Sequence, residues 1–479
     1  MVSEGSHALE KLFFPKNIAV VGVSSSAKHF RPDQGRNYIQ GSIAQNFQGR
    51  IFPVHPKAKD TLGFKTYARV SDIPEDVDLA IFTVPATVVL EVMKDCIEKK
   101  VKFVHLFTAG FSETGREDFA EIEKTMIKMA KDAGIRMLGP NCMGLYCPEG
   151  GLAFQPFFPH APGHTAFFSQ SGQMAGQFVY KAADNKLAFS KVVSFGNSSD
   201  LSSSDFLDYF LQDEKTKCIG SYIEGLKDGR RFFEIAKKIT RIKPLVIFKG
   251  GRTEGGSRAA RSHTAAIAGS YQLWKSFCKQ TGIIAVTSLN ELVYTLSAVQ
   301  RLALPTGKNI AVIGGAGGGS VTMTDVAEAE GLTVPRLSDH TIAELTKIVP
   351  PHGTSVQNPL DIGPAMMGEQ IFDKLAELLR DDPNIDALIF LQPVGMIKRM
   401  GWGREGVDMM IKTTLKGQEI MKKPIIPVVE KDDNEGLDFA LMAEERYFQA
   451  GLPTFPTFEM AARVVNNLAD YQKYRSKFE

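Results

Sequence analysis

IAVVGVSSSAKHFRPDQG, residues 18–35, starts with an apolar, β-branched run and turns at once into small polar residues. A short buried strand followed by a Gly/Ser turn and a helix is the opening unit of a parallel α/β sheet. Gly22 and Ser24 would then lie at the amino terminus of the helix, where free backbone amides and the helix dipole favour a phosphate. The stretch therefore predicts an α/β fold with an anion site at its first turn.

Short apolar runs of the same kind alternate with helical-period segments along the rest of the chain. The clearest strands are predicted at 18–23, 79–84, 102–107, 165–170, 191–196, 244–250, 309–315, 386–391 and 424–430. The alternation breaks in the Pro/Gly-rich segment 148–164 and restarts after 301–309. We therefore expect three α/β domains, at 1–147, 148–303 and 304–479.

Composition excludes several classes of function. Apolar residues make up 43% of the 479 residues, charged residues 23%, and the formal net charge is +2, with no basic runs that would indicate nucleic-acid binding. No apolar run reaches the length of about 18 residues that a membrane span requires, and the amino terminus does not resemble a secretion signal. Five cysteines without CxxC spacing are typical of a reducing compartment. We expect a cytoplasmic protein without a membrane or nucleic-acid partner.

The end of the second strand of the first domain indicates which ligand the first strand-to-helix turn could bind. An NAD-binding domain places an acidic residue at the end of that strand, to hold the ribose hydroxyls. Here the strand ends in PVHPK, so that Lys57 stands near the expected position of the acid. A cation there suits a ribose phosphate, and coenzyme A, which has a 3′-phosphate, fits these residues better than NAD. A solvated lysine without a ligand is the open alternative.

Two further strand-to-helix turns are candidate anion sites. FFSQSGQMAG puts Ser169, Ser171 and Gly172 at the start of a helix, where they could bind phosphate or serve only as an N-cap. GGAGGGSV (314–321) has more glycines than a simple cap needs, but it lacks the lysine of a P-loop.

Other polar residues are expected at the ligand side of the sheets. GPNCMG (139–144) carries Asn141 and Cys142 beyond a strand end, and Glu224 follows the apolar strand of SYIEG. A carboxylate there could orient and stabilise an imidazole, or it could be a solvated strand-end residue.

His263 is the candidate nucleophile. It lies in KGGRTEGGSRAARSHT, a stretch of small residues and arginines that we predict to be a loop. A neutral imidazole nitrogen can accept a phosphoryl group, and nearby Gly and Ser amides can hold its oxygens. A loop histidine without chemical function is the alternative. No HExxH, paired CxxC or GxSxG motif is present, so that we predict no metal site and no α/β-hydrolase.

Taken together, these segments resemble the α subunit of NDP-forming acyl-CoA synthetases, the ADP-forming acetyl-CoA synthetase group related to succinyl-CoA synthetase. The resemblance covers nearly the whole chain and depends on the order of its motifs. They are VVGVSS, PVHPK, FTAGFSETG, GPNCMG, SQSG, SFGN, YIEG, KGGRTEGGSRAARSHT and the stretch from NIAVIGGAGGG to NPLDI.

The resemblance implies a Rossmann-like CoA-binding domain followed by two flavodoxin-like domains. It also implies that His263 is phosphorylated, that Glu224 stabilises it, and that Ser169, Ser171 and Gly172 bind phosphate. It places coenzyme A at Gly22, Ser24, Lys57, Val84, Pro85, Thr108, Ala109, Gly110, Asn141 and Cys142. The implied reaction is the reversible conversion of acyl-CoA, phosphate and ADP to acid, CoA and ATP.

Some residues depart from the family pattern. Arg261 and Ala265 flank the Ser-His-Thr core, which motivates an alternative in which the chain is a CoA-binding regulatory subunit without turnover. The aromatic stretch FQPFFPH (154–160) suggests an acid bulkier than acetate.

No nucleotide-binding domain is recognised in the chain. We therefore expect a separate ATP-grasp β subunit, in an α2β2 assembly, to supply ADP or ATP with Mg²⁺.

Overall fold

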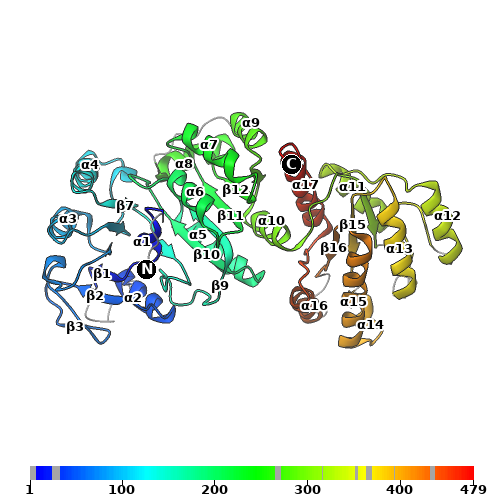
Figure 1. Cartoon of the computed structure of the whole chain (residues 1–479), viewed down its shortest axis with the longest axis horizontal. Helices are drawn as coiled ribbons and strands as arrows, with labels where there is room; N and C mark the ends of the chain where they lie inside the picture. The colour runs from blue at the N-terminus through cyan, green and yellow to red at the C-terminus, as the bar shows by residue number, and fades with distance from the viewer. Residues whose placement is uncertain are drawn as a thin grey trace. The chain divides into compact units, whose positions relative to one another are not determined.

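The computed structural model describes most of the chain and divides it into two compact units, Met1–Leu292 and Val293–Glu479, each considered by itself (Figure 1). The described residues are 7–23, 33–264, 271–314, 317–350, 354–362, 369–392, 394–431 and 437–479, with the backbone alone for 260–264. Ser24 and Ala265 lie outside these ranges. Among the described residues, no helix combines the length and apolar character that crossing a membrane requires.

The first unit begins with a five-stranded parallel sheet in the order β2-β1-β5-β6-β7. Its strands are short and almost fully buried because helices cover both faces. They are β1 (Asn17–Val21), β2 (Arg50–Val54), β5 (Leu79–Phe82), β6 (Phe103–Leu106) and β7 (Arg136–Leu138). The order reverses between β1 and β5, and ligands of such sheets bind beyond the strand ends at this point.

The helices around this sheet are α1 (Glu10–Phe13), α2 (Gln34–Ala44), α3 (Val89–Glu98) and α4 (Glu117–Asp132). Three 3₁₀ turns, η1 (Val70–Asp72), η2 (Ala86–Val88) and η3 (Ser112–Thr114), and a hairpin of β3 (Asp60–Thr61) and β4 (Phe64–Lys65) complete the connections. Apolar side chains repeat at helical spacing on α3, where Val89, Met93 and Cys96 are buried against the sheet.

The same unit contains a second sheet, in the order β13-β12-β11-β9-β10-β8, which is parallel except for β8. Its strands are β8 (Gly144–Tyr146), β9 (Pro162–Ser169), β10 (Phe189–Ser194), β11 (Cys218–Ile223), β12 (Leu245–Lys249) and β13 (Ile284–Val286). Its helices are α5 (Gly172–Asp184), α6 (Ser203–Gln212), α7 (Gly229–Ile239), α8 (Glu254–Thr264) and α9 (Tyr271–Thr281). Helix α10 (Leu289–Arg301) begins in this unit and continues into the second one. β8 precedes residue 147, the predicted end of the first domain, yet it pairs with β10 of the second sheet.

The second unit has a three-stranded parallel sheet of β14 (Ile310–Ile313), β15 (Ala387–Leu391) and β16 (Ile425–Val428). Separate apolar clusters fill its two faces, as in a doubly wound fold. Its helices are α11 (Gly318–Ala329), α12 (Asp339–Ile348), α13 (Glu369–Asp381), α14 (Val394–Arg399), α15 (Gly403–Met421), α16 (Leu437–Gln449) and α17 (Phe458–Arg475).

Polar contacts join the two sheets of the first unit. Arg136 at the start of β7 donates to both carboxylate oxygens of Asp200, at 2.9 and 3.0 Å, and Asp200 also accepts from the backbone N–H of Met137 at 2.7 Å. A second contact is made by the hydroxyl of Tyr209, which donates to Glu10 at 2.7 Å. These contacts link the segments that carry the two sheets.

Candidate functional site

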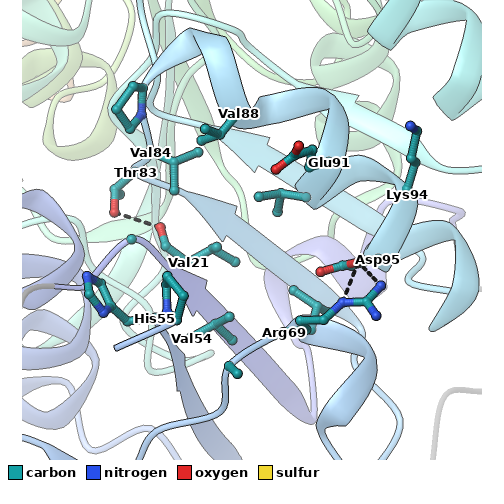
Figure 2. Close-up of a pocket in the computed structure, with 16 residues that line it drawn as sticks. Val21, Val54, His55, Arg69, Thr83, Val84, Val88, Glu91, Lys94 and Asp95 are labelled. Carbon is teal, nitrogen blue, oxygen red and sulfur yellow. Dashed lines mark hydrogen bonds and ion pairs between the residues drawn. The ribbon is translucent and has the colours of Figure 1, made fainter. Parts of the chain in front are cut away.

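A cavity of about 650 Å³ opens at the carboxyl ends of β1, β2 and β5, where the strand order reverses (Figure 2). Three of the predicted CoA-binding residues, Gly22, Val84 and Pro85, line it. Its other walls are apolar, with charged side chains at the α3 side. The full lining is Val21, Gly22, Val54, His55, Pro56, Ala68, Arg69, Val70, Thr83, Val84, Pro85, Val88, Glu91, Val92, Lys94 and Asp95.

Gly22 adopts a backbone conformation that the cavity needs. Its φ is +99°, and a Cβ atom there would lie 2.8 Å from the carbonyl oxygen of Thr83 and 2.8 Å from Cγ1 of Val84. Its N–H donates to the carbonyl of Val54 at 3.0 Å. The glycine of the first turn thus lets the ends of β1, β2 and β5 approach one another closely.

None of the charged residues that line the cavity was predicted from the sequence. Lys57 is exposed and does not line the cavity, but its backbone N–H donates to Nδ1 of His55 at 3.2 Å. Arg69 was not predicted, because it belongs to no motif; its Nε donates to Asp95 at 3.1 Å on the α3 side of the cavity (Figure 2). The cavity therefore combines mainly apolar walls with an imidazole, two cationic and two carboxylate side chains.

The Thr108–Gly110 turn is already engaged in protein contacts. The Thr108 hydroxyl donates to the carbonyl of Val84 at 2.7 Å, and the N–H of Gly110 donates to Glu113 at 2.6 Å. Ala109 is exposed. The hydroxyl and the Gly110 amide therefore shape the turn, and of its three residues Ala109 is the most open to a ligand.

Asn141 and Cys142 have different surroundings. The Asn141 side chain donates to Asn197 at 3.4 Å, and Asn197 donates to Glu113 at 2.7 Å, so that three separate turns share one chain of hydrogen bonds. The thiol of Cys142 is buried and points to the carbonyl of Leu106 at 3.5 Å. Burial raises the pKa of this thiol, which favours its protonated form.

The second predicted turn forms the amino terminus of α5. Ser171 is the N-cap, since its hydroxyl accepts from the N–H of Met174 at 3.3 Å, and Ser169 accepts from the N–H of Ser171 at 3.1 Å. A Cβ on Gly172 would lie 2.3 Å from Cγ of Met143, which follows Cys142. The structure thus brings the GPNCMG turn against the first residue of α5.

Glu224 lies beside this turn and is only 5% exposed. The side-chain oxygen of Gln170 accepts from the N–H of Glu224 and from the N–H of Gly225, the latter at 3.0 Å. The hydroxyl of Tyr222 donates to the Glu224 carboxylate at 3.1 Å, and Lys249 donates to the Glu224 carbonyl at 2.6 Å. Glu224 is therefore not the solvated strand-end residue of the alternative hypothesis.

Gln170, Tyr222 and Lys249 were not predicted from the sequence. A signal existed for Tyr222, because residues two apart on a strand point to the same face. Burial lowers the pKa of Lys249, although the nearby Glu224 opposes this.

The prediction of a loop around His263 is wrong, because the backbone there forms the helix α8 from Glu254 to Thr264. Thr253 caps the helix by accepting from the N–H of Gly256 at 3.1 Å, and Arg258 pairs with Glu254 one turn away at 3.1 Å. These local contacts outweigh the two glycines of the first turn. α8 lies beside η3, in the segment that carries Glu113. The side chains of Arg261 and His263 lie outside the described part of the structure.

Among the described residues, no group of three or more His, Cys, Asp and Glu side chains is arranged to hold a metal ion.

Comparisons with known proteins match the chain over almost its whole length. A model described as a CoA binding domain matches residues 16–148, a succinyl-CoA ligase like flavodoxin domain matches 162–299, and a ligase-CoA domain matches 310–476. The chain is 34% identical to the alpha subunit of ADP-forming acetate–CoA ligase II from Pyrococcus furiosus, over 93% of this chain and 99% of that one.

The chain belongs to the α subunits of ADP-forming acyl-CoA synthetases.

A second relative and a solved structure agree with this family. ADP-forming acetate–CoA ligase II from Archaeoglobus fulgidus is 33% identical, over 98% of this chain and 67% of that one. The dinucleotide-forming acetyl-coenzyme A synthetase 1 of Candidatus Korarchaeum cryptofilum, solved with phosphate and ADP, matches with a TM-score of 0.81 and 31% identity over 98% of both chains. The predicted family and α/β fold class are confirmed, and the chain is a subunit of an acid–CoA ligase rather than a regulatory subunit without turnover.

Proposed function

We propose that this α subunit converts acyl-CoA, phosphate and ADP reversibly to a carboxylic acid, CoA and ATP, with His263 as the phosphoryl carrier. The observation that carries the proposal is the position of Gln170. It lies between Ser169 and Ser171 at the amino terminus of α5, and its side chain accepts from the backbone of Glu224 and Gly225. A helix-terminal anion site and a buried carboxylate are thereby adjacent.

The residues have distinct roles in this proposal. Ser169, Ser171 and Gly172 hold phosphate while one of its oxygens attacks the thioester carbon; the C–S bond breaks and CoA leaves as the thiolate. A ring nitrogen of His263 then attacks phosphorus, the bond from phosphorus to the acyl oxygen breaks, and the acid leaves as a carboxylate. The phosphorylated ring carries positive charge, which the carboxylate of Glu224 balances.

Coenzyme A is assigned to the cavity at the first sheet. Gly22, Val84 and Pro85 would contact it there, and Lys57 would extend the site at its rim. The predicted contact of Ser24 with coenzyme A lies outside the described residues. Thr108, Ala109, Gly110, Asn141 and Cys142 would border the thioester end, because their turns connect the cavity to Met143 and Gly172. We propose domain boundaries at 1–147, 148–303 and 304–479; family-model matches end at 148 and 299 and resume at 162 and 310.

The nucleotide half of the reaction is assigned to a partner. The similar Pyrococcus protein is named as an alpha subunit, and this chain covers 67% of the Archaeoglobus relative. We infer an ATP-grasp β subunit that binds Mg²⁺ with ADP or ATP in a cytoplasmic α2β2 assembly. Light scattering of the two co-expressed chains should show the heterotetramer, and separate elution of the two chains would contradict it.

The structure does not support a bulky acid through the aromatic stretch 154–160. Phe154 and Phe158 are 1% exposed and pack against each other with ring centres 4.8 Å apart, whereas Phe157 is 81% exposed. Phe154 and Phe158 therefore pack in the core near β8, and Phe157 lies on the surface. Thermal melts with a panel of acyl-CoA thioesters would identify the acid, because a ligand of the native state stabilises it more the tighter it binds.

Phosphorylation tests the main proposal. The complex, incubated with acyl-CoA, radiolabelled phosphate and Mg²⁺, should become labelled on His263. His263→Asn should abolish the label, while His160→Asn, at an exposed position, should leave it unchanged. A label that persists in His263→Asn would exclude His263 as the carrier.

A further inference from the structure

The surroundings of Glu224 constrain it at three points. Its N–H is held by Gln170 and its carbonyl by Lys249, and its carboxylate accepts from the hydroxyl of Tyr222 at 3.1 Å. The first two contacts fix the backbone at the end of β11. The contact with Tyr222 acts on the carboxylate itself and restricts the direction in which it points.

The Tyr222 ring is placed by packing that does not require its hydroxyl. It meets Phe248 on the neighbouring strand β12 edge to face, with ring centres 5.3 Å apart and planes at 66°. A phenylalanine would make the same contact. Burial and the neighbouring Glu224 raise the pKa of Tyr222, so that the hydroxyl keeps its proton and can donate it.

The glycine at position 250 leaves room for the Tyr222 hydroxyl and the Glu224 side chain. A Cβ on Gly250 would lie 2.6 Å from the Tyr222 hydroxyl oxygen and 3.3 Å from Cγ of Glu224. Gly250 directly follows β12, next to Lys249. Two neighbouring strands therefore contribute to the same arrangement, one through its tyrosine and the other through the absence of a side chain.

We propose that Tyr222 is a positioning residue for phosphoryl transfer, which holds the Glu224 carboxylate in the orientation that balances charge on His263. The inference depends on the proposed function. Tyr222 acts through Glu224 and does not itself contact substrate. Removing the hydroxyl should therefore slow the transfer to His263 without affecting the earlier formation of acyl phosphate or the binding of CoA.

The test compares Tyr222→Phe with Tyr180→Phe, an exposed tyrosine of α5, both in the full chain with its partner subunit. Rapid-quench measurements should show phosphohistidine forming about tenfold more slowly in Tyr222→Phe, since hydrogen bonds to charged groups contribute on this order. The release of CoA from acyl-CoA and phosphate and the KM for acyl-CoA should match those of the wild type. Tyr180→Phe should match it in every measurement.

Gly250→Ala provides an independent variant. The added methyl group should displace the Tyr222 hydroxyl and slow phosphohistidine formation similarly. A Tyr222→Phe variant that phosphorylates at the wild-type rate, or that loses CoA release together with phosphorylation, would overturn the positioning role. If His263→Asn still becomes labelled, the proposed function fails instead, so the two failures are distinguishable.

Discussion

Substitution of Gly22 by alanine tests the placement of coenzyme A. Gly22 has a φ of +99°, and a Cβ there would collide with the Thr83 carbonyl at 2.8 Å. Gly63, in the β3–β4 hairpin of the same domain, has a φ of +81°, but a Cβ added there would have no atom within 4 Å, which makes it a matched control. Both alanine variants strain the backbone, and only Gly22→Ala also creates a collision.

The expected difference follows from these two contributions. An unfavourable backbone conformation costs about 1–3 kcal/mol, and this cost is common to both variants. The collision at Gly22 adds about 1–3 kcal/mol, because the ends of β1 and β5 must move apart. With a shift of about 2–4 °C per kcal/mol, Gly22→Ala should melt at least about 2 °C below Gly63→Ala.

Calorimetry with CoA completes the test on both variants in the assembled enzyme. Gly22→Ala should bind CoA at least about tenfold more weakly, since displaced strand ends deform the cavity and about 1.4 kcal/mol corresponds to a factor of ten. Gly63→Ala should bind it normally. Equal melting temperatures would refute the argument from packing, and unchanged CoA affinity in Gly22→Ala would refute the assignment of CoA to this cavity.

Three predictions concern buried titratable groups. Burial lowers the pKa of His105 to about 4. On acidification the unfolded chain, in which this pKa is about 6.5, binds the proton first, so the free energy of unfolding should decrease as the pH falls from about 6.5 to about 4. Thermal melts should show a smaller decrease in His105→Leu. Burial raises the pKa of the Cys142 thiol, so native protein should leave it unmodified by a disulfide reagent at neutral pH, whereas mass spectrometry should find it modified after unfolding. Lys191 and Asp213 form a buried ion pair at 2.9 Å, so Lys191→Met should lower the free energy of unfolding in urea by about 3–5 kcal/mol, and adding Asp213→Leu should restore most of it.

Much of the fold could be predicted from local patterns. The runs at 18–23, 79–84 and 386–391 coincide with β1, β5 and β15 except at their ends, where turn residues such as Gly22 follow the last ladder pair. Three-residue strands such as β8 and β13 show no period that would indicate them. β8 pairs with a strand about 45 residues away, so its place is decided by tertiary contacts that no local pattern contains.

The site could be predicted only where a motif carries its own chemistry. Gly22, Glu224 and the Ser169–Gly172 turn follow strands directly, and the ends of parallel strands meet on one side of a sheet. Arg69 reaches the cavity from a connection between β4 and β5, and its pairing with Asp95 on α3 depends on the packing of distant segments. Small residues suggested a loop before His263, because composition alone does not show that Thr253 caps a helix there.

The hydrogen bonds between turns explain why separate motifs occur together. Glu113 accepts from Gly110 in its own turn and from Asn197, and Asn197 accepts from Asn141. FTAGFSETG, GPNCMG and SFGN therefore form one structural unit at the joint between the two sheets of the first unit, although nearly 60 residues separate Asn141 from Asn197. Because α8 lies beside η3, the helix that carries His263 contacts the same unit. A change in any one of these turns should alter the position of the Thr108–Gly110 turn, which we propose to border coenzyme A, relative to α8. Each motif therefore constrains the others through geometry rather than through its own chemistry.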